Sequence, residues 1–307
     1  MKDLFSCKKN INSQFGEDGI IEEVFERLKH ISDKYCCEFG AWNGKHFSNT
    51  YNLISNHNYN AVLIEGNTAR FNELKITFPE ENIVKINKFV DFRKKNEGGG
   101  DNLDQILSSV NFKKDFDFLS IDIDGCDYYV FESIVVYRPK LICVEFNRTI
   151  PNHIVFIQKK DIKVRQGCSA LAFVNLAKEK NYSLIASTHD NLFFIENTYK
   201  NFFTKELSLG IDELVANNNK VYIFSGFDGT IFTSKEVFLP WHEMTIKEIT
   251  VLPKILTKCP GYFNLFEKCI FYIYKLSNDP SKYLKNPKKY FRLLLKILMR
   301  KVLFFKK

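Results

Sequence analysis

Short apolar runs alternate with segments of helical length between residues 35 and 196. Several of these runs lack polar alternation, which is typical of strands buried on both faces of a parallel sheet. Regular alternation of strands and helices predicts right-handed crossovers and a mostly parallel sheet covered by helices. The pattern predicts strands at 35–39, 61–65, 83–90, 116–123, 141–146, 182–188 and 192–196, and helices near 46–56, 68–77, 102–110, 127–135 and 168–180.

The last two predicted strands are separated only by residues 189–191. This connection is too short for a crossover between parallel strands, so the two strands are expected to form an antiparallel hairpin. The predicted fold class is α/β, with a seven-stranded, mostly parallel, Rossmann-like sheet and a reversed terminal strand. A plain dinucleotide-binding fold has no reason for that reversed strand.

The composition changes beyond this sheet. We expect one domain over residues 1–245, in which residues 198–245 form an accessory hairpin subdomain. Residues 246–307 are expected to form a basic, aromatic C-terminal region with an amphipathic helix starting near Tyr290. Ten of the 44 basic residues and none of the 36 acidic residues follow Asp279. The remainder is nearly neutral, which argues against a nucleic acid as partner.

The chain lacks the long apolar runs that are typical of membrane-spanning helices and of signal peptides. No run reaches the 18 apolar residues of a spanning helix, and the N-terminus has no signal-peptide pattern. We therefore expect a cytoplasmic protein. Residues 282–307 are expected to make peripheral contact with an anionic membrane at its inner face, or to dock on the body or on a second subunit. The oligomeric state stays open.

The strongest local signal is the stretch CCEFGAWNGKHFSNT, with Glu38, Gly40 and Gly44 at the end of the first predicted strand. Glycine lets the backbone turn tightly and approach a ligand, and ligands of open α/β sheets bind beyond the carboxyl ends of the strands. The spacing differs from the GxGxxG that cradles a pyrophosphate, which favours a nucleoside without a diphosphate. Glu65 ends the second strand, where an acid can accept both ribose hydroxyls. A plain strand–turn–helix connection would explain the glycines equally well.

Three stretches, EFGAWNG at 38–44, LIEG at 63–66 and DIDG at 122–125, resemble motifs of S-adenosylmethionine-dependent methyltransferases of the FkbM-like branch. SQFGEDG at 13–19 and EFNRTIP at 145–151 resemble a bacterial subgroup associated with surface-glycan biosynthesis. The likeness runs in order over roughly residues 12–245. It implies S-adenosylmethionine as cofactor, with the segment around Gln14 folded over it. The cofactor-binding residues that it implies are Gln14, Asp18, Glu38, Gly40, Ala41, Gly44, Glu65, Gly66 and Asp122.

Oxygen-bearing side chains also follow the fourth and fifth predicted strands. Asp124, Glu145 and Asn147 resemble positions of metal-dependent O-methyltransferases and offer the oxygen ligands that Mg²⁺ or another divalent cation prefers. Such a cation orients a hydroxyl and lowers its pKa. Asp124 is also expected to face the substrate as a catalytic residue. The alternative is that these side chains contact only the cofactor or stabilise loops.

A methyl acceptor usually also loses a proton, and a histidine is suited to accept it. His153 is the first choice because it follows Asn147 beyond the fifth strand, and His189 in the terminal hairpin is the second. His46 and His242 are weaker candidates. For each of them, an ordinary surface or core role competes with the catalytic one.

The resemblance implies an enzyme that O-methylates a sugar or related precursor of a surface polysaccharide. Its expected partner is a small-molecule or nucleotide-linked glycan substrate, which the basic side chains of the loop 147–168 would meet. One alternative is a methyltransferase acting on a phosphate or phosphoramidate group of a capsule precursor. Another is a non-catalytic nucleotide-binding scaffold at the membrane.

Overall fold

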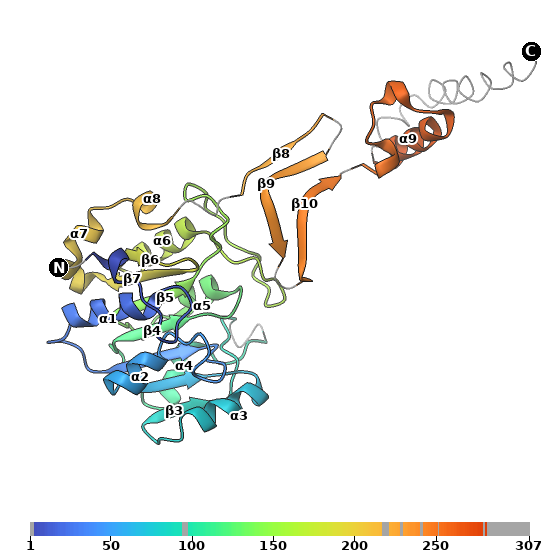
Figure 1. Ribbon diagram of the computed structural model, residues 1–307. Coiled ribbons are helices and arrows are strands. Elements are labelled where there is room, and N and C mark those ends of the chain that lie inside the picture. Colours follow the sequence, from blue (N-terminus) through green and yellow to red (C-terminus); the bar gives the residue numbers. More distant parts are fainter. Residues whose placement is uncertain are drawn as a thin grey trace, which may run out of the picture. The chain divides into compact units, whose positions relative to one another are not determined.

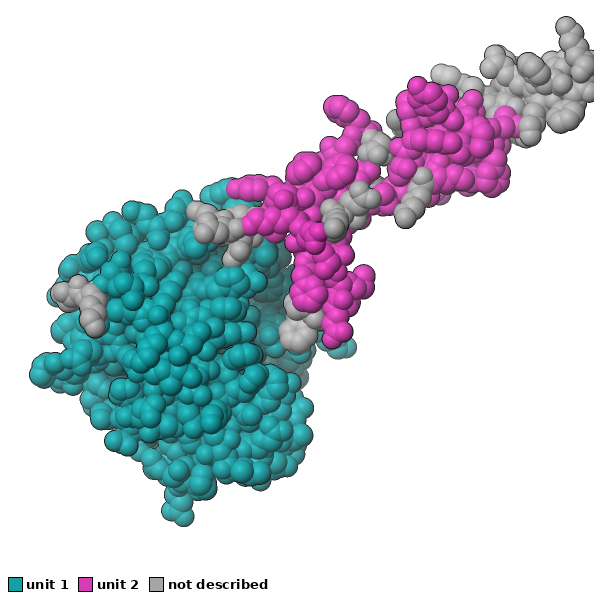
Figure 2. Space-filling model, viewed as in Figure 1, with its two compact units in different colours: residues 1–220 teal, residues 221–307 magenta. Residues whose placement is uncertain are grey.

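A computed structural model describes residues 3–93, 98–216, 221–227, 230–239, 242–250, 252–278 and 280. The chain divides into two compact units, residues 1–220 and 221–307, which Figure 2 shows in different colours. The division falls before the expected boundary at residue 245, because β10 (Met244–Thr250) pairs with β9 (Thr230–Leu239) across that position. The short helices that follow residue 197 belong to the first unit.

The first unit is built on a seven-stranded sheet with the order β3-β2-β1-β4-β5-β7-β6 (Figure 1). Strands β1 to β5 pair in parallel, whereas β7 runs antiparallel to both β5 and β6. This arrangement confirms the predicted α/β fold with its reversed terminal strand. The strands are β1 Tyr35–Phe39, β2 Asn60–Ile64, β3 Ile83–Ile86, β4 Phe118–Ile121, β5 Leu141–Glu145, β6 Tyr182–Ser187 and β7 Asn191–Glu196.

Helices cover both faces of this sheet and enclose two separate apolar cores. Successive residues of a strand feed opposite cores: Leu63 lies in the core that also holds Leu53 of α2, whereas Ile64 lies in the core that holds Phe173 of α6. Burial on both faces explains why the strands read as continuous apolar runs. Side chains of α1 Glu17–Arg27, α2 Tyr51–His57 and α3 Thr68–Thr77 fill one core, and those of α4 Leu103–Ser109, α5 Asp127–Ser133 and α6 Ala170–Glu179 fill the other.

Two helices depart from the sequence prediction. The helix α1 was not predicted, although Ile20, Val24 and Leu28 recur at helical spacing and are fully buried. The helix predicted from residue 46 begins only at Tyr51, because residues 48–50 give their hydrogen bonds to the Glu38 carboxylate instead of to a helical turn.

The remaining elements are short. In the first unit they are η1 Leu4–Cys7, η3 Asn197–Phe203, α7 Thr204–Leu207 and α8 Ile211–Leu214. The second unit contains a three-stranded antiparallel sheet, in which β8 Ile223–Ser225 and β9 form the hairpin expected in this part of the chain, followed by η5 Lys254–Leu256, η6 Pro260–Tyr262 and α9 Leu265–Asn278. The helix expected from Tyr290 onward lies outside the described residues. Among the helices that the structure describes, none combines the length and apolar character needed to cross a bilayer.

Candidate active site at the carboxyl edge of the sheet

The loop that follows β1 passes directly against the chain that follows β4. Gly40 has φ +71°, and a Cβ at this position would lie 2.0 Å from the carbonyl oxygen of Asp122. Gly44 has φ +75°, and a Cβ there would lie 2.5 Å from Leu74 of α3. Only glycine tolerates both the left-handed backbone and the close approach. Gly40 therefore lets the two predicted site loops meet, and Gly44 lets the glycine loop pack against α3.

Glu65 ties the glycine loop to the end of β2. Its carboxylate accepts hydrogen bonds from the backbone N–H groups of Trp42 at 2.8 Å and Asn67 at 2.7 Å. Each carboxylate oxygen can accept more than one hydrogen bond, so both oxygens retain capacity for a further donor such as a ribose hydroxyl. The predicted neighbours Ala41 and Gly66 flank these contacts, and a Cβ on Gly66 would meet the Phe89 ring at 2.3 Å.

Glu38, at the end of β1, is occupied by the loop that precedes α2. It accepts hydrogen bonds from the Ser48 and Thr50 hydroxyls at 2.6 Å each and from the Asn49 N–H at 2.9 Å. Burial raises the pKa of this carboxyl, and the three donors oppose the rise. The contacts give Glu38 a positioning role for residues 48–50, with no contact to a ligand needed to explain its burial.

The N-terminal loop is held by the buried carboxylate of Asp18. One oxygen, Oδ2, accepts hydrogen bonds from the N–H groups of Ile11, Asn12 and Ser13 at 2.7, 2.7 and 2.8 Å. The other oxygen, Oδ1, is buried and finds no hydrogen-bond donor in the described part of the chain. Gln14 itself is exposed. Asp18 thus fixes the conformation of residues 11–13, in the loop that is predicted to fold over the cofactor.

This loop and the glycine loop line one pocket of about 380 Å³. The volume lies within the range of small-molecule sites. The pocket is open and its wall combines amide, hydroxyl, cationic and aromatic groups. Its lining residues are Ile11, Asn12, Ser13, Asn43, Lys45, His46 and Phe47.

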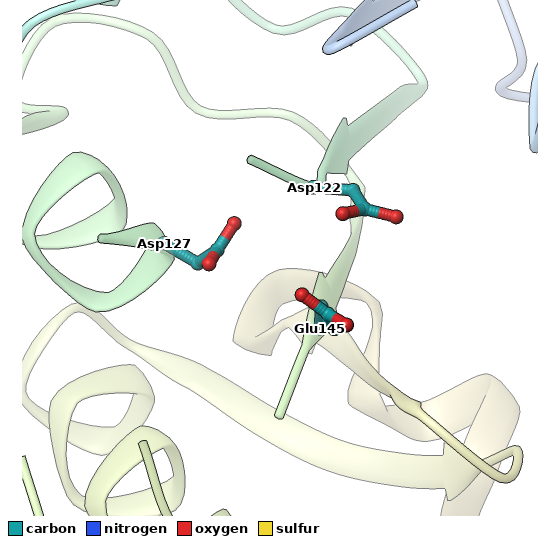
Figure 3. A group of neighbouring side chains, drawn as sticks. All are labelled: Asp122, Asp127 and Glu145. Atoms are coloured by element: carbon teal, nitrogen blue, oxygen red, sulfur yellow. The ribbon is translucent and has the colours of Figure 1, made fainter. Parts of the chain in front are cut away.

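Three carboxylates gather where β4 and β5 end. Asp122 follows β4, Asp127 is the first residue of α5, and Glu145 is the last residue of β5; their oxygens lie within 4.8 Å of one another (Figure 3). Burial raises the pKa of all three carboxyls, to about 6 for Asp127, and repulsion from neighbouring carboxylates, Asp124 among them, adds to the rise. Within the described residues none of the three forms an ion pair. A divalent cation would relieve the repulsion, because oxygen ligands of this kind suit Mg²⁺.

Of the two carboxylates predicted as metal ligands, Glu145 belongs to this group and Asp124 does not. Asp124 has φ +59° and lies 3.6 Å from Arg165, while the pKa of its carboxyl is raised by burial. The Asn147 amide donates to the carbonyl of Gln166 at 2.7 Å and accepts from the N–H of Thr149 at 3.0 Å. The left-handed turn at Asp124 explains why its carboxylate lies outside the group, because the turn leads the chain away from the direction of β4.

The carboxylate group contains Asp127, whereas the predicted metal site contained Asp124. Asp127 accepts hydrogen bonds from the N–H groups of Ile123 and Gly125, both at 2.8 Å. The sequence prediction of a metal site did not include Asp127. The signal that identifies it is the spacing of three aspartates in Asp122–Asp127, with a glycine that turns the chain between them.

The two leading histidine candidates differ in their surroundings. His153 is exposed. His189 stacks on Phe15 with ring centroids 4.6 Å apart, and its Nδ1 lies 2.7 Å from Arg148 Nη1 and 3.3 Å from Asp190 Oδ1. Arg148 also donates a hydrogen bond to Asp190. The next residue, Asn191, is the register partner of Glu145, so His189 lies near the strand end that carries the carboxylate group.

Comparison with known proteins adds the following findings. No model of a known protein family and no curated protein matches the chain. Solved structures with a similar fold include the CurJ carbon methyltransferase (9% identity, 58% of this chain, 52% of that chain, TM-score 0.38). TrmK of M. capricolum in complex with S-adenosyl-homocysteine matches at 12% identity, 57% and 68% coverage and a TM-score of 0.32. The glycopeptide N-methyltransferase MtfA complexed with S-adenosyl-L-methionine matches at 10% identity, 63% and 89% coverage and a TM-score of 0.33. The chain thus spans about half the length of the CurJ structure.

Proposed function

We propose that this protein is an S-adenosylmethionine-dependent methyltransferase that transfers a methyl group to a hydroxyl of a sugar or related glycan precursor. The observation that carries the proposal is the meeting of the glycine loop and the loop held by Asp18 around one pocket, with Glu65 bound to the glycine loop through the N–H of Trp42, at the carboxyl edge of a sheet with a reversed terminal strand. Ligands of such sheets bind at this edge. The sugar acceptor rests on the resemblance to FkbM-like proteins.

The residues of the glycine loop are proposed to hold the nucleoside. The lone pairs that Glu65 does not use for Trp42 and Asn67 would accept the two ribose hydroxyls. Gly40 would let the glycine loop turn close to the ligand, and residues 11–13, which line the pocket together with residues of the glycine loop, would cover it. When bound, the cofactor supplies an electrophilic methyl group on a sulfonium.

His189 is proposed as the proton acceptor in place of His153. If Nδ1–H is donated to Asp190, which lies 3.3 Å away, the lone pair of Nε2 is free to take the hydroxyl proton while the new oxygen–carbon bond forms. In this tautomer Nδ1 has no lone pair to accept from Arg148, which instead holds Asp190 through a hydrogen bond, while Phe15 packs against the ring. Alignment of donor and acceptor supplies much of the remaining rate enhancement.

The carboxylate group is proposed to hold a divalent cation beside the acceptor. Asp122, Asp127 and Glu145 offer three oxygen ligands without competition from a basic side chain in the described residues. Bound there, a cation would lower the pKa of a coordinated hydroxyl. Activity that survives EDTA unchanged would remove the cation from this mechanism.

Thermal unfolding with added ligands tests the proposed cofactor. S-adenosylhomocysteine should raise the melting temperature, because a ligand that binds only the folded state stabilises it by mass action. NAD and ADP serve as controls with a diphosphate. No shift at millimolar S-adenosylhomocysteine would contradict the proposal, and a larger shift with NAD would favour a dinucleotide-binding protein.

A further inference from the structure

The helix α9 presents an apolar stripe to solvent. Phe266, Ile273 and Leu276 are 67%, 65% and 47% exposed. Their spacing of seven and three residues places them on one face of the helix. Helices of globular proteins ordinarily turn such a stripe toward a core, so this exposed face requires a partner.

The charged residues of α9 lie away from this stripe. Glu267 is buried and forms an ion pair with Lys258 at 2.6 Å, and Lys275 stacks over the Phe271 ring at 4.1 Å. Asn264 and Glu267 exchange hydrogen bonds at the helix start, which fixes where α9 begins. The helix thus keeps its one acidic side chain away from the exposed stripe.

The sequence that follows α9 supplies the charge that identifies the partner. Residues 280–307 contain ten lysines and arginines and no acid. A second copy of this chain would bring the same positive charge and would be repelled. An anionic lipid surface attracts the charge and also accepts apolar side chains below its headgroups.

We propose that the α9 face formed by Phe266, Ile273 and Leu276 docks on an anionic membrane surface, with the basic residues after Asp279 providing the electrostatic attraction. The attachment is peripheral and reversible. It would hold the enzyme or scaffold at the membrane whatever reaction the first unit performs, so its test is independent of the proposed function.

Vesicle flotation of the full chain tests the proposal. Vesicles of phosphatidylcholine are compared with vesicles that also contain phosphatidylglycerol, at about 0.1 M and about 1 M salt, where the Debye length is about 10 Å and about 3 Å. Binding is expected only to the anionic vesicles and only at the lower salt concentration. Ile273→Ser should weaken it about tenfold. Its matched control is Ile76→Ser on α3, where Ile76 is 81% exposed, and this variant should bind as the parent does.

Charge variants separate the electrostatic contribution to vesicle binding from the contribution of the apolar face. The triple variant Lys285→Gln, Lys288→Gln and Lys289→Gln should lose about fivefold in binding for each lysine. Its control replaces three exposed lysines of the first unit, Lys75, Lys178 and Lys205, by glutamine and should change nothing.

Four results would overturn the proposal, and the last of them assigns the face to a second copy. The first is the absence of binding to anionic vesicles at the lower salt concentration. The second is equal binding to neutral vesicles. The third is equal binding of the Ile273→Ser and Ile76→Ser variants; if Ile273→Ser instead converts a dimer to a monomer in sedimentation, the face belongs to a second copy.

Discussion

Buried carboxylates organise the loops at the carboxyl edge of the sheet. Asp18 takes three backbone N–H groups, Glu38 takes three donors from residues 48–50, and Glu65 takes two backbone N–H groups. A carboxylate holds backbone donors strongly, because charge-assisted hydrogen bonds are roughly twice as strong as neutral ones. The sequence predicted all three as ligand contacts, and the structure adds the protein groups that each of them holds. The sequence identified the acids but could not predict these protein partners, because the partners depend on the folded loops.

The Asp18 carboxylate offers the clearest test of loop positioning. Asp18→Ala should destabilise the fold by about 2–4 kcal/mol and weaken S-adenosylhomocysteine binding at least about tenfold, because three buried N–H groups lose their acceptor. Asp18→Asn keeps a carbonyl acceptor and should recover part of both losses. Thermal unfolding and calorimetry measure the two effects. Full binding by Asp18→Ala would show that the loop does not shape the site.

The carboxylate group makes stability depend on pH when no divalent cation is present. The raised pKa values of Asp122, Asp127 and Glu145 mean that the folded state binds more protons than the unfolded chain, whose acids titrate near pH 4. Stability in EDTA should therefore fall as the pH rises from about 4 through about 6, where Asp127 titrates.

Glu145→Gln tests the repulsion within this group. It removes one negative charge and should raise the free energy of unfolding at pH 8 by on the order of 1–2 kcal/mol, with little change at pH 4. Glu179→Gln at the exposed end of α6 is the control. Urea unfolding at the two pH values measures both variants. A Glu145→Gln variant less stable than the parent at pH 8 would contradict the electrostatic account.

At the scale of elements, the sequence pattern predicts the strands of the sheet, but it does not predict the conformations of the loops. Strands buried on both faces need continuous apolar residues, which a local reading detects. The start of α2 at Tyr51 depends instead on Glu38, ten or more residues earlier in the chain. The turn at Asp124 likewise separates two acids that strand geometry alone would place on one face.

Gly40 and Gly98 form a matched pair that tests the contact between the β1 and β4 loops. Both have positive φ, +71° and +74°, but a Cβ on Gly40 would lie 2.0 Å from the Asp122 carbonyl oxygen, whereas a Cβ on Gly98 would meet nothing within 4 Å. Gly98→Ala should cost only about 1 kcal/mol of backbone strain. Gly40→Ala should cost at least about 3 kcal/mol, measured by urea unfolding. Equal costs would show that the two loops are not in contact.

At the scale of the whole molecule, composition predicts two regions, and the two compact units of the structure divide at a different residue. The change to a basic, aromatic sequence is visible near residue 246, whereas the second compact unit begins at residue 221. The reason is that β10 pairs with β9, and strand pairing between segments is not encoded in local composition. The first unit contains the proposed active site, and the second contains the proposed membrane face.

The central claim is that the Glu65 carboxylate binds the ribose hydroxyls of the nucleoside. Calorimetry with two ligands tests it most directly. The parent protein should bind S-adenosylhomocysteine more tightly than its 2′-deoxy analogue. The Glu65→Ala variant should bind S-adenosylhomocysteine more weakly than the parent does, and it should bind both ligands equally well. Glu73→Ala, an exposed glutamate on α3, should behave as the parent does. If the parent shows no heat with S-adenosylhomocysteine, or Glu65→Ala still prefers the ribose form, the account of the site is wrong.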